Sequence, residues 1–97
     1  MNTDITTYRM HSYDVTKQPD GTWSGEMVDL ATKVSLDPTR SNATIIYQLV
    51  RWGLLHEDLN EDNCRVGGTD EDIYFTDTRD GRPVLRLAMT HTDRNTL

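Results

Sequence analysis

The sequence predicts an α+β domain in which one amphipathic helix packs on an antiparallel sheet made of two hairpins. Two segments, 5–36 and 71–90, alternate apolar and polar residues, and each contains an Asp-Gly turn, which is the pattern of a β-hairpin. Between them, residues 37–53 repeat apolar side chains at three- and four-residue spacing, which indicates a helix with one buried face. The order hairpin, helix, hairpin is typical of a sheet covered by one helix.

Residues 5–36 form the first predicted hairpin. The stretch ITTYRMHSYDVT has the Thr, Tyr and Val content of a strand. QPDGT at 18–22 supplies the turn, because Pro19 presets φ and Gly21 accepts a positive φ. TWSGEMV is the return strand, and ATKVSL at 31–36 either extends it or makes a short third strand.

Residues 37–53 contain the predicted helix. Asp37 precedes a proline and is a candidate N-cap, with Asn42 as an alternative later start. Gly53 is the predicted stop. Periodicity in this helix and in the second hairpin predicts the core residues Ile45, Ile46, Leu49, Val50, Phe75, Leu85 and Leu87.

The second half of the chain begins with an acidic loop, expected at 54–72. Residues 71–90 then alternate again around an Asp-Gly turn at 79–82. The polar tail 91–97 is expected to fray. A chain of 97 residues makes one domain, which we expect to span 1–97.

Negative charge is concentrated in one part of the chain. Nine carboxylates fall within the 24 residues from Glu57 to Asp80, where only Arg65 and Arg79 oppose them, although the whole chain has a net charge of −6. Close carboxylates repel one another, and solubility alone would be met by scattering them. We therefore interpret them as a partner-binding face, with Tyr74 as its aromatic contact. The predicted carboxylates are Glu57, Asp58, Glu61, Asp62, Asp70, Glu71, Asp72, Asp77 and Asp80.

No catalytic or metal-binding pattern is visible. The histidines and Cys64 show no spacing that favours a nucleophile–base pair. HEDLN lacks the second histidine of a zinc-binding helix, and DTRDG lacks the alternating oxygen ligands of a calcium loop. We expect a protein that is not an enzyme and has no cofactor or metal site, although acidic runs bind divalent ions loosely in any case.

The remaining features predict a cytoplasmic monomer. Cys64 is the single cysteine, which fits a reducing compartment. No apolar run approaches the length of a membrane span, and the N-terminus lacks the pattern of a secretory signal. The pI of about 4.8 argues against nucleic acid or a membrane as a direct ligand, because both repel an acidic face.

The carboxylate spacing suggests mimicry of a nucleic-acid backbone. Alternate residues on a strand lie about 6.6 Å apart, and helical neighbours at i and i+4 lie about 5–6 Å apart at Cβ. Such rows approximate the phosphates that a Lys/Arg-lined groove is built to bind. With HEDLNEDN, TDEDIYFTDTRDG and the low pI, the small chain resembles phage-encoded anti-CRISPR proteins of the type I-F, DNA-mimic kind. The resemblance implies an inhibitor in the host cytoplasm that binds the crRNA-guided surveillance complex and blocks target DNA binding.

Three other interpretations remain open. A strand, PDGTW, a strand and a helix also resemble the HicB type of small antitoxin, which pairs with an RNA-binding toxin, although no room remains for the DNA-binding module such antitoxins usually carry. A small-ligand enzyme would need a cleft lined by His11 or Cys64. Finally, the acidic segment can be a solubilising surface only.

Overall fold

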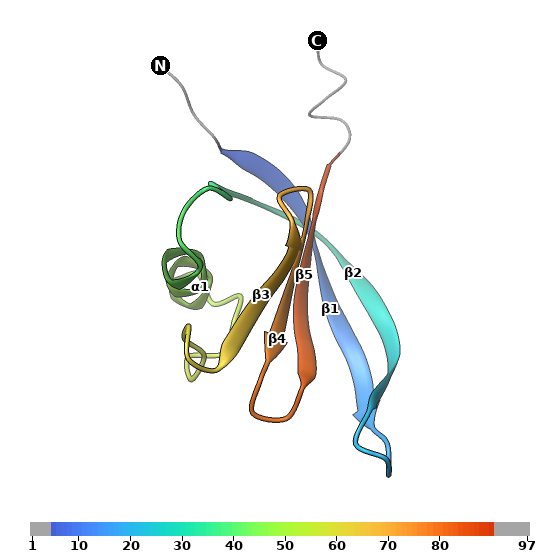
Figure 1. Cartoon of the computed structure of the whole chain (residues 1–97). Coiled ribbons are helices and arrows are strands. Elements are labelled where there is room, and N and C mark those ends of the chain that lie inside the picture. Colours follow the sequence, from blue (N-terminus) through green and yellow to red (C-terminus); the bar gives the residue numbers. More distant parts are fainter. Residues whose placement is uncertain (1–4, 91–97) are drawn as a thin grey trace.

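One helix lies against a single antiparallel sheet with strand order β2-β1-β5-β4-β3 (Figure 1). The computed structural model describes residues 5–90. An α+β fold is therefore confirmed, and two-hairpin architecture is only roughly matched because the sheet has five strands. The elements are β1 (Thr6–Lys17), β2 (Trp23–Leu36), α1 (Asn42–Arg51), β3 (Cys64–Thr69), β4 (Asp72–Asp77) and β5 (Arg82–Met89).

The β1–β2 hairpin is longer than the rest of the sheet. Its register runs from Lys17 opposite Trp23 to Thr6 opposite Leu36, so ATKVSL extends the return strand. By contrast, β5 pairs with β1 only from Tyr8 to His11. The outer half of the hairpin consequently projects beyond the other strands (Figure 1).

The expected acidic loop at 54–72 contains a strand, and this corrects the sequence interpretation. β3 pairs with β4, which turns the second hairpin into a three-stranded meander. Gly67 and Gly68 weaken the strand pattern of the segment because glycine is depleted in strands. Gly68 nevertheless has φ +91°, and a Cβ atom there would lie 2.1 Å from the backbone oxygen of Asp72. Glycine at this position allows the two backbones to approach closely.

Replacing Gly68 with alanine is therefore expected to destabilise the domain by about 1–3 kcal/mol, since the new side chain would be both strained and obstructed. Gly67→Ala is the matched control, because a Cβ there would meet nothing within 4 Å. Urea denaturation of both variants measures the difference. Equal midpoints for the two would contradict the proposed backbone contact.

The helix begins later than the candidate cap Asp37. Ser41 is the N-cap, and its Oγ accepts a hydrogen bond from the Thr44 N–H at 3.2 Å. Asp37 instead accepts from the Thr39 N–H at 2.9 Å and closes a turn ahead of the helix. The Asp-Pro pair thus marks a turn rather than a helix start.

The predicted helix stop at Gly53 is confirmed. Gly53 has φ +78°, and its N–H donates to the Val50 carbonyl at 3.0 Å. The next residue, Leu54, donates to the Leu49 carbonyl at 2.8 Å. These two bonds form a Schellman motif, which ends the helix and turns the chain toward the acidic loop.

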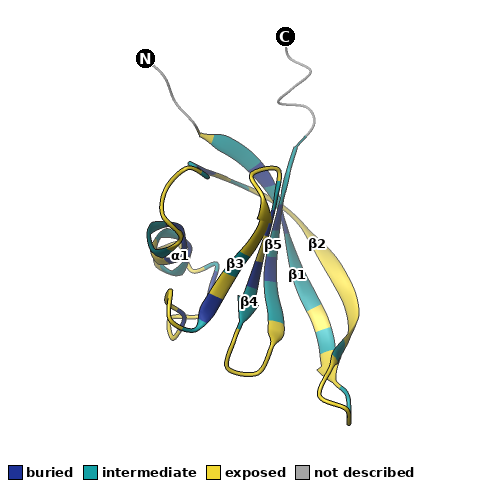
Figure 2. Ribbon diagram, viewed as in Figure 1, coloured by how far each residue is buried: buried dark blue, intermediate teal, exposed yellow. Residues whose placement is uncertain are grey.

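The core lies between α1 and one face of the sheet (Figure 2). Six of the seven predicted core residues are buried, whereas Val50 is partly buried and packs against them. Tyr8 and Met10 from β1 also belong to the core. The predicted tail 91–97 lies outside the described residues.

Candidate partner-binding surface

The loop between α1 and β3 is anchored by apolar side chains. Leu55 and Leu59 are buried in the core, although neither was predicted there. The intervening residues Glu57 and Asp58 are exposed. The two leucines therefore determine which side of the loop packs on the core and which side faces solvent.

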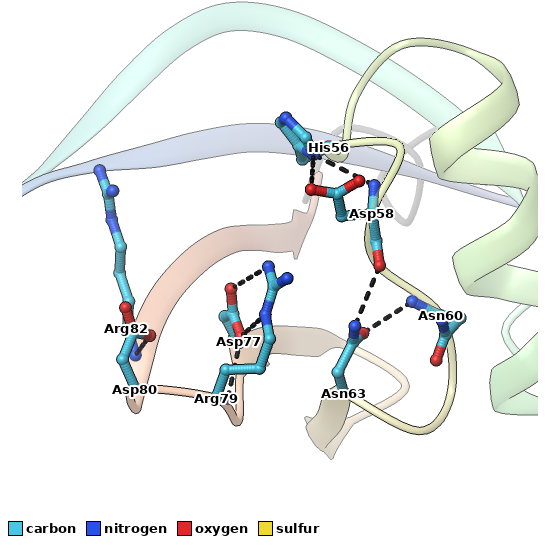
Figure 3. Close-up of polar contacts among 8 residues, drawn as sticks. All are labelled: His56, Asp58, Asn60, Asn63, Asp77, Arg79, Asp80 and Arg82. Carbon is cyan, nitrogen blue, oxygen red and sulfur yellow. Dashed lines mark hydrogen bonds and ion pairs between the residues drawn. The ribbon is translucent and has the colours of Figure 1, made fainter.

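The side chains of Asn60, Asn63 and His56 hold the backbone of this loop (Figure 3). Asn63 accepts from the Asn60 N–H at 2.8 Å and donates to the Asp58 carbonyl at 3.0 Å. His56 Nδ1 accepts from the Asp58 N–H at 3.1 Å. Asn60 Oδ1 in turn accepts from the N–H of Asp62 at 2.8 Å. The loop is therefore ordered without use of its carboxylates, except that Asp58 Oδ2 lies 3.4 Å from His56 Nδ1.

Three loop carboxylates have no compensating partner within residues 5–90. Glu57, Glu61 and Asp62 are exposed, and the side chains make no hydrogen bond or ion pair with the part of the chain that the structure describes. We call these three residues the free loop carboxylates. They contribute negative charge to the surface without contributing a bond to the fold.

The β4–β5 turn lies beside this loop and carries charges of both signs (Figure 3). Arg79 donates two hydrogen bonds to Asp77, at 3.0 and 2.8 Å, and these bonds lower the pKa of Asp77. Asp80 is exposed, and its Oδ1 accepts from the Arg82 N–H at 3.1 Å. A hollow of about 330 Å³ separates loop and turn, lined by residues that include Leu54, Leu55, His56, Asp58, Leu59, Asp77, Arg79, Asp80, Arg82 and Val84.

The other predicted carboxylates lie at the opposite end of β4. Asp70 and Glu71 are exposed in the β3–β4 turn. Asp72 accepts two hydrogen bonds from Arg86, at 2.7 and 2.9 Å, and a third from the Tyr74 hydroxyl at 3.0 Å. The Arg86 guanidinium also lies 5.6 Å from the centre of the Tyr74 ring. The charge of Asp72 is thus compensated within the chain.

The predicted residues consequently form two groups rather than one continuous face. A strand rises about 3.3 Å per residue, so the two ends of β4 at Asp72 and Asp77 are roughly 17 Å apart. The first group is Asp70, Glu71, Asp72 and Tyr74, and the second is Glu57, Asp58, Glu61, Asp62, Asp77 and Asp80. Figure 1 shows the β3–β4 and β4–β5 turns at opposite ends of the sheet.

One acidic pair was missed by sequence reasoning. Asp14 on β1 faces Glu26 on β2 directly across the hairpin, and both are exposed. Like charges directly opposite destabilise a sheet. The QPDGT turn sets the register of the hairpin, and that register places these two residues opposite each other. The pair could therefore have been predicted from the turn.

Stability is expected to fall in acid through the Asp72–Arg86 pair. Hydrogen bonds from Arg86, and then from Tyr74, lower the pKa of Asp72. Because the folded-state pKa is depressed, the stabilisation is complete above the ordinary value of about 3.9 and is lost as pH falls through the folded-state value. Asp72→Asn should lower the free energy of unfolding by about 1 kcal/mol near neutral pH. It should also make that free energy depend less on pH below about pH 4.

Urea midpoints measured from neutral pH to pH 2 check this expectation. Arg86→Met should flatten the same part of the curve, since it removes the donor to Asp72. If both variants kept the wild-type slope, the acid dependence would arise elsewhere in the protein.

Comparison with known protein families, curated proteins and solved structures finds no match for this chain. Within residues 5–90, no group of three or more His, Cys, Asp or Glu side chains is arranged to hold a metal ion. The only helix in that range, α1, lacks the length and apolar character of a membrane span. The function must therefore be inferred from the surface itself.

Proposed function

We propose that this protein is a non-catalytic inhibitor that presents carboxylates to a Lys/Arg-lined groove of a nucleic-acid-binding partner. The free loop carboxylates carry this proposal. They sit on a loop whose backbone is held by Asn60, Asn63 and His56, so the fold gives no reason for grouping them. Close like charges cost stability, and a basic partner would turn this cost into binding energy.

An apolar hollow beside the free loop carboxylates favours a protein as the partner. It has a volume of about 340 Å³ and lies between α1 and the loop, with Glu57 and Glu61 among its lining residues. Tyr47 contributes to it and is 62% exposed. Apolar patches surrounded by polar residues are the usual anatomy of protein interfaces. The apolar lining residues are Ala43, Ile46, Tyr47, Val50 and Leu59.

The particular target we propose is the crRNA-guided surveillance complex of a type I-F CRISPR system. The resemblance of HEDLNEDN and TDEDIYFTDTRDG to the DNA-mimic kind of anti-CRISPR protein supports this choice. A further support is the length of β4: its two ends, near which the two acidic groups lie, are roughly 17 Å apart, about half a turn of a DNA duplex. By occupying the target-DNA groove, the protein would exclude duplex DNA without any turnover.

A competition experiment tests this proposal. Purified protein is added to a type I-F surveillance complex before labelled target DNA, at low and high salt. We expect loss of DNA binding at one protein per binding site, with weaker inhibition at high salt because exposed charges are screened. Unchanged DNA binding, together with failure of the protein to co-migrate with the complex, would exclude this target.

A small antitoxin-like protein is the second candidate. The order β1, β2, α1 matches the strand, turn, strand and helix on which the resemblance to HicB-type proteins rests, and an RNA-binding toxin is also a basic partner. Co-expression with a candidate basic toxin distinguishes the two functions. Rescue of growth by the wild type would favour the antitoxin role over CRISPR inhibition.

A further inference from the structure

Among the described residues, no strand pairs with the outer edge of β2. Of residues 5–90, only β1 pairs with this strand, and nearly all of its residues are exposed (Figure 2). Three large apolar side chains lie close together on it: Met27 is 45% exposed, and Val28 and Leu30 are each 40% exposed. An open strand edge with apolar side chains is a template for pairing with another strand.

Lysine and proline, two of the usual protections of an edge strand, are absent from the stretch of β2 around Val28. Soluble proteins block open edges with lysines, prolines, bulges or very short strands. The segment Glu26–Leu30 contains no lysine or proline. A bulge limits this segment on one side, because residues 30–32 of β2 lie opposite the single residue Met10 of β1 and Ala31 has φ +55°. On the other side, Gly25 has φ +151°. At the other edge of the sheet, β3 is six residues long and exposes no large apolar side chain.

We propose that β2 pairs antiparallel with β2 of a second copy of this chain, about a two-fold axis at Val28. In this register Val28 faces its own copy, Met27 faces the partner's Asp29, and Glu26 faces the partner's Leu30. Two-fold symmetry is the usual symmetry of homodimers and requires a self-complementary surface. In this register no two like charges of residues 26–30 face each other, so charge repulsion does not oppose the pairing.

Side-chain positions on both faces of the strand fit this register. Val28 and Leu30 share one face, so they meet the partner's Val28 directly and its Leu30 diagonally, within reach of apolar contact. On the other face, Asp29 already accepts two hydrogen bonds from Arg9, at 2.9 and 2.8 Å. The charge of Asp29 is therefore compensated within its own chain, and Met27 of the second copy would pack beside a paired carboxylate. Moving the axis to Asp29 would instead place the two Asp29 carboxylates opposite each other.

The proposed dimer is independent of the inhibitor proposal and replaces the expected monomer. β3 lies at the opposite edge of the sheet from β2. When the two sheets join through β2, the free loop carboxylates of each copy would therefore lie away from the dimer axis. A dimer would therefore carry two acidic surfaces at its outer ends. Because only residues 26–30 of each copy would pair, we expect a weak dimer whose population rises with protein concentration.

Sedimentation velocity tests the dimer without any knowledge of the partner. From micromolar to millimolar concentration, the wild type should move from the 11.1 kDa chain mass toward twice that mass. Val28→Lys places two like charges at the axis and should raise the dimer dissociation constant at least tenfold. Thr78→Lys, an equal change at an exposed turn residue, should leave it unchanged, and circular dichroism verifies that each variant is folded.

Mixing two variants tests the register. Val28→Lys and Val28→Glu should each be monomeric alone, whereas an equimolar mixture should form a heterodimer, because opposite charges then face each other at the axis. A wild type that remains monomeric at millimolar concentration would overturn the proposal. A wild-type dimer with no recovery in the mixture would overturn the axis at Val28.

Discussion

Phe75→Ala is expected to destabilise the domain by about 3–5 kcal/mol, because it leaves a cavity at the centre of a close-packed core. Phe75 is 1% exposed and pairs with Leu85 on β5. A typical domain has only about 5–15 kcal/mol of stability. For a chain of about this size, each kcal/mol lowers the melting temperature by roughly 4–8 °C. The variant should therefore melt at least 12 °C below the wild type.

Tyr47→Ala is the control for this substitution. Tyr47 is 62% exposed on α1, and alanine has the higher helix propensity, so the variant should stay within about 0.5 kcal/mol of the wild type. Calorimetry or thermal circular dichroism measures both. A loss below 1 kcal/mol for Phe75→Ala would contradict the burial of Phe75 in the core.

Neutralising the free loop carboxylates is expected to abolish most of the binding to a basic partner. The variant carries Glu57→Gln, Glu61→Gln and Asp62→Asn together. Electrostatic steering raises association rates by about 10- to 1,000-fold, so loss of three charges should slow association by about two orders of magnitude. The fold should become slightly more stable, by roughly 0.2–0.5 kcal/mol for each close like-charged pair removed.

A variant with Asp14→Asn, Asp20→Asn and Glu26→Gln is the matched control, and asparagine at position 20 keeps the oxygen that accepts from the Thr22 N–H. It removes the same charge from the β1–β2 hairpin and should slow association much less. The combination of higher stability with weaker binding distinguishes a functional surface from a structural one. Equal binding losses in both variants would mean that net charge, rather than the loop, determines affinity. Asp72 is less suitable for this test, because its replacement also breaks the bonds to Arg86.

The parts of the fold that were predictable are those determined by short-range chemistry. The turns at QPDGT and RDGR, the stop at Gly53 and the apolar periodicity of α1 each depend on a few neighbouring residues. The start of the helix was harder, because Asp37 and Ser41 are both good caps. Strand β3 was missed because Gly67 and Gly68 weaken its pattern, and Gly68 is needed only for a contact with Asp72, which follows the turn.

The candidate site was predictable in composition but not in arrangement. Clustering of carboxylates along the chain was visible, yet β4 separates them into two groups. Compensation of Asp72 by Arg86 depends on the register in which β4 pairs with β5. The predicted hairpin at 71–90 implied the pairing of the two strands but not this register. Burial of Leu55 and Leu59 determines which loop carboxylates face solvent, and these leucines were hidden within a segment interpreted as acidic.

The salt dependence of binding to the type I-F surveillance complex tests the central claim most directly. Affinities of the wild type, the neutralised loop variant and the hairpin control would be measured over a range of salt concentrations. We predict a steep loss of affinity with salt for the wild type and the control, and both a lower affinity and a shallower slope for the loop variant. Wild-type affinity and slope in the loop variant would contradict the claim that the free loop carboxylates bind a basic groove.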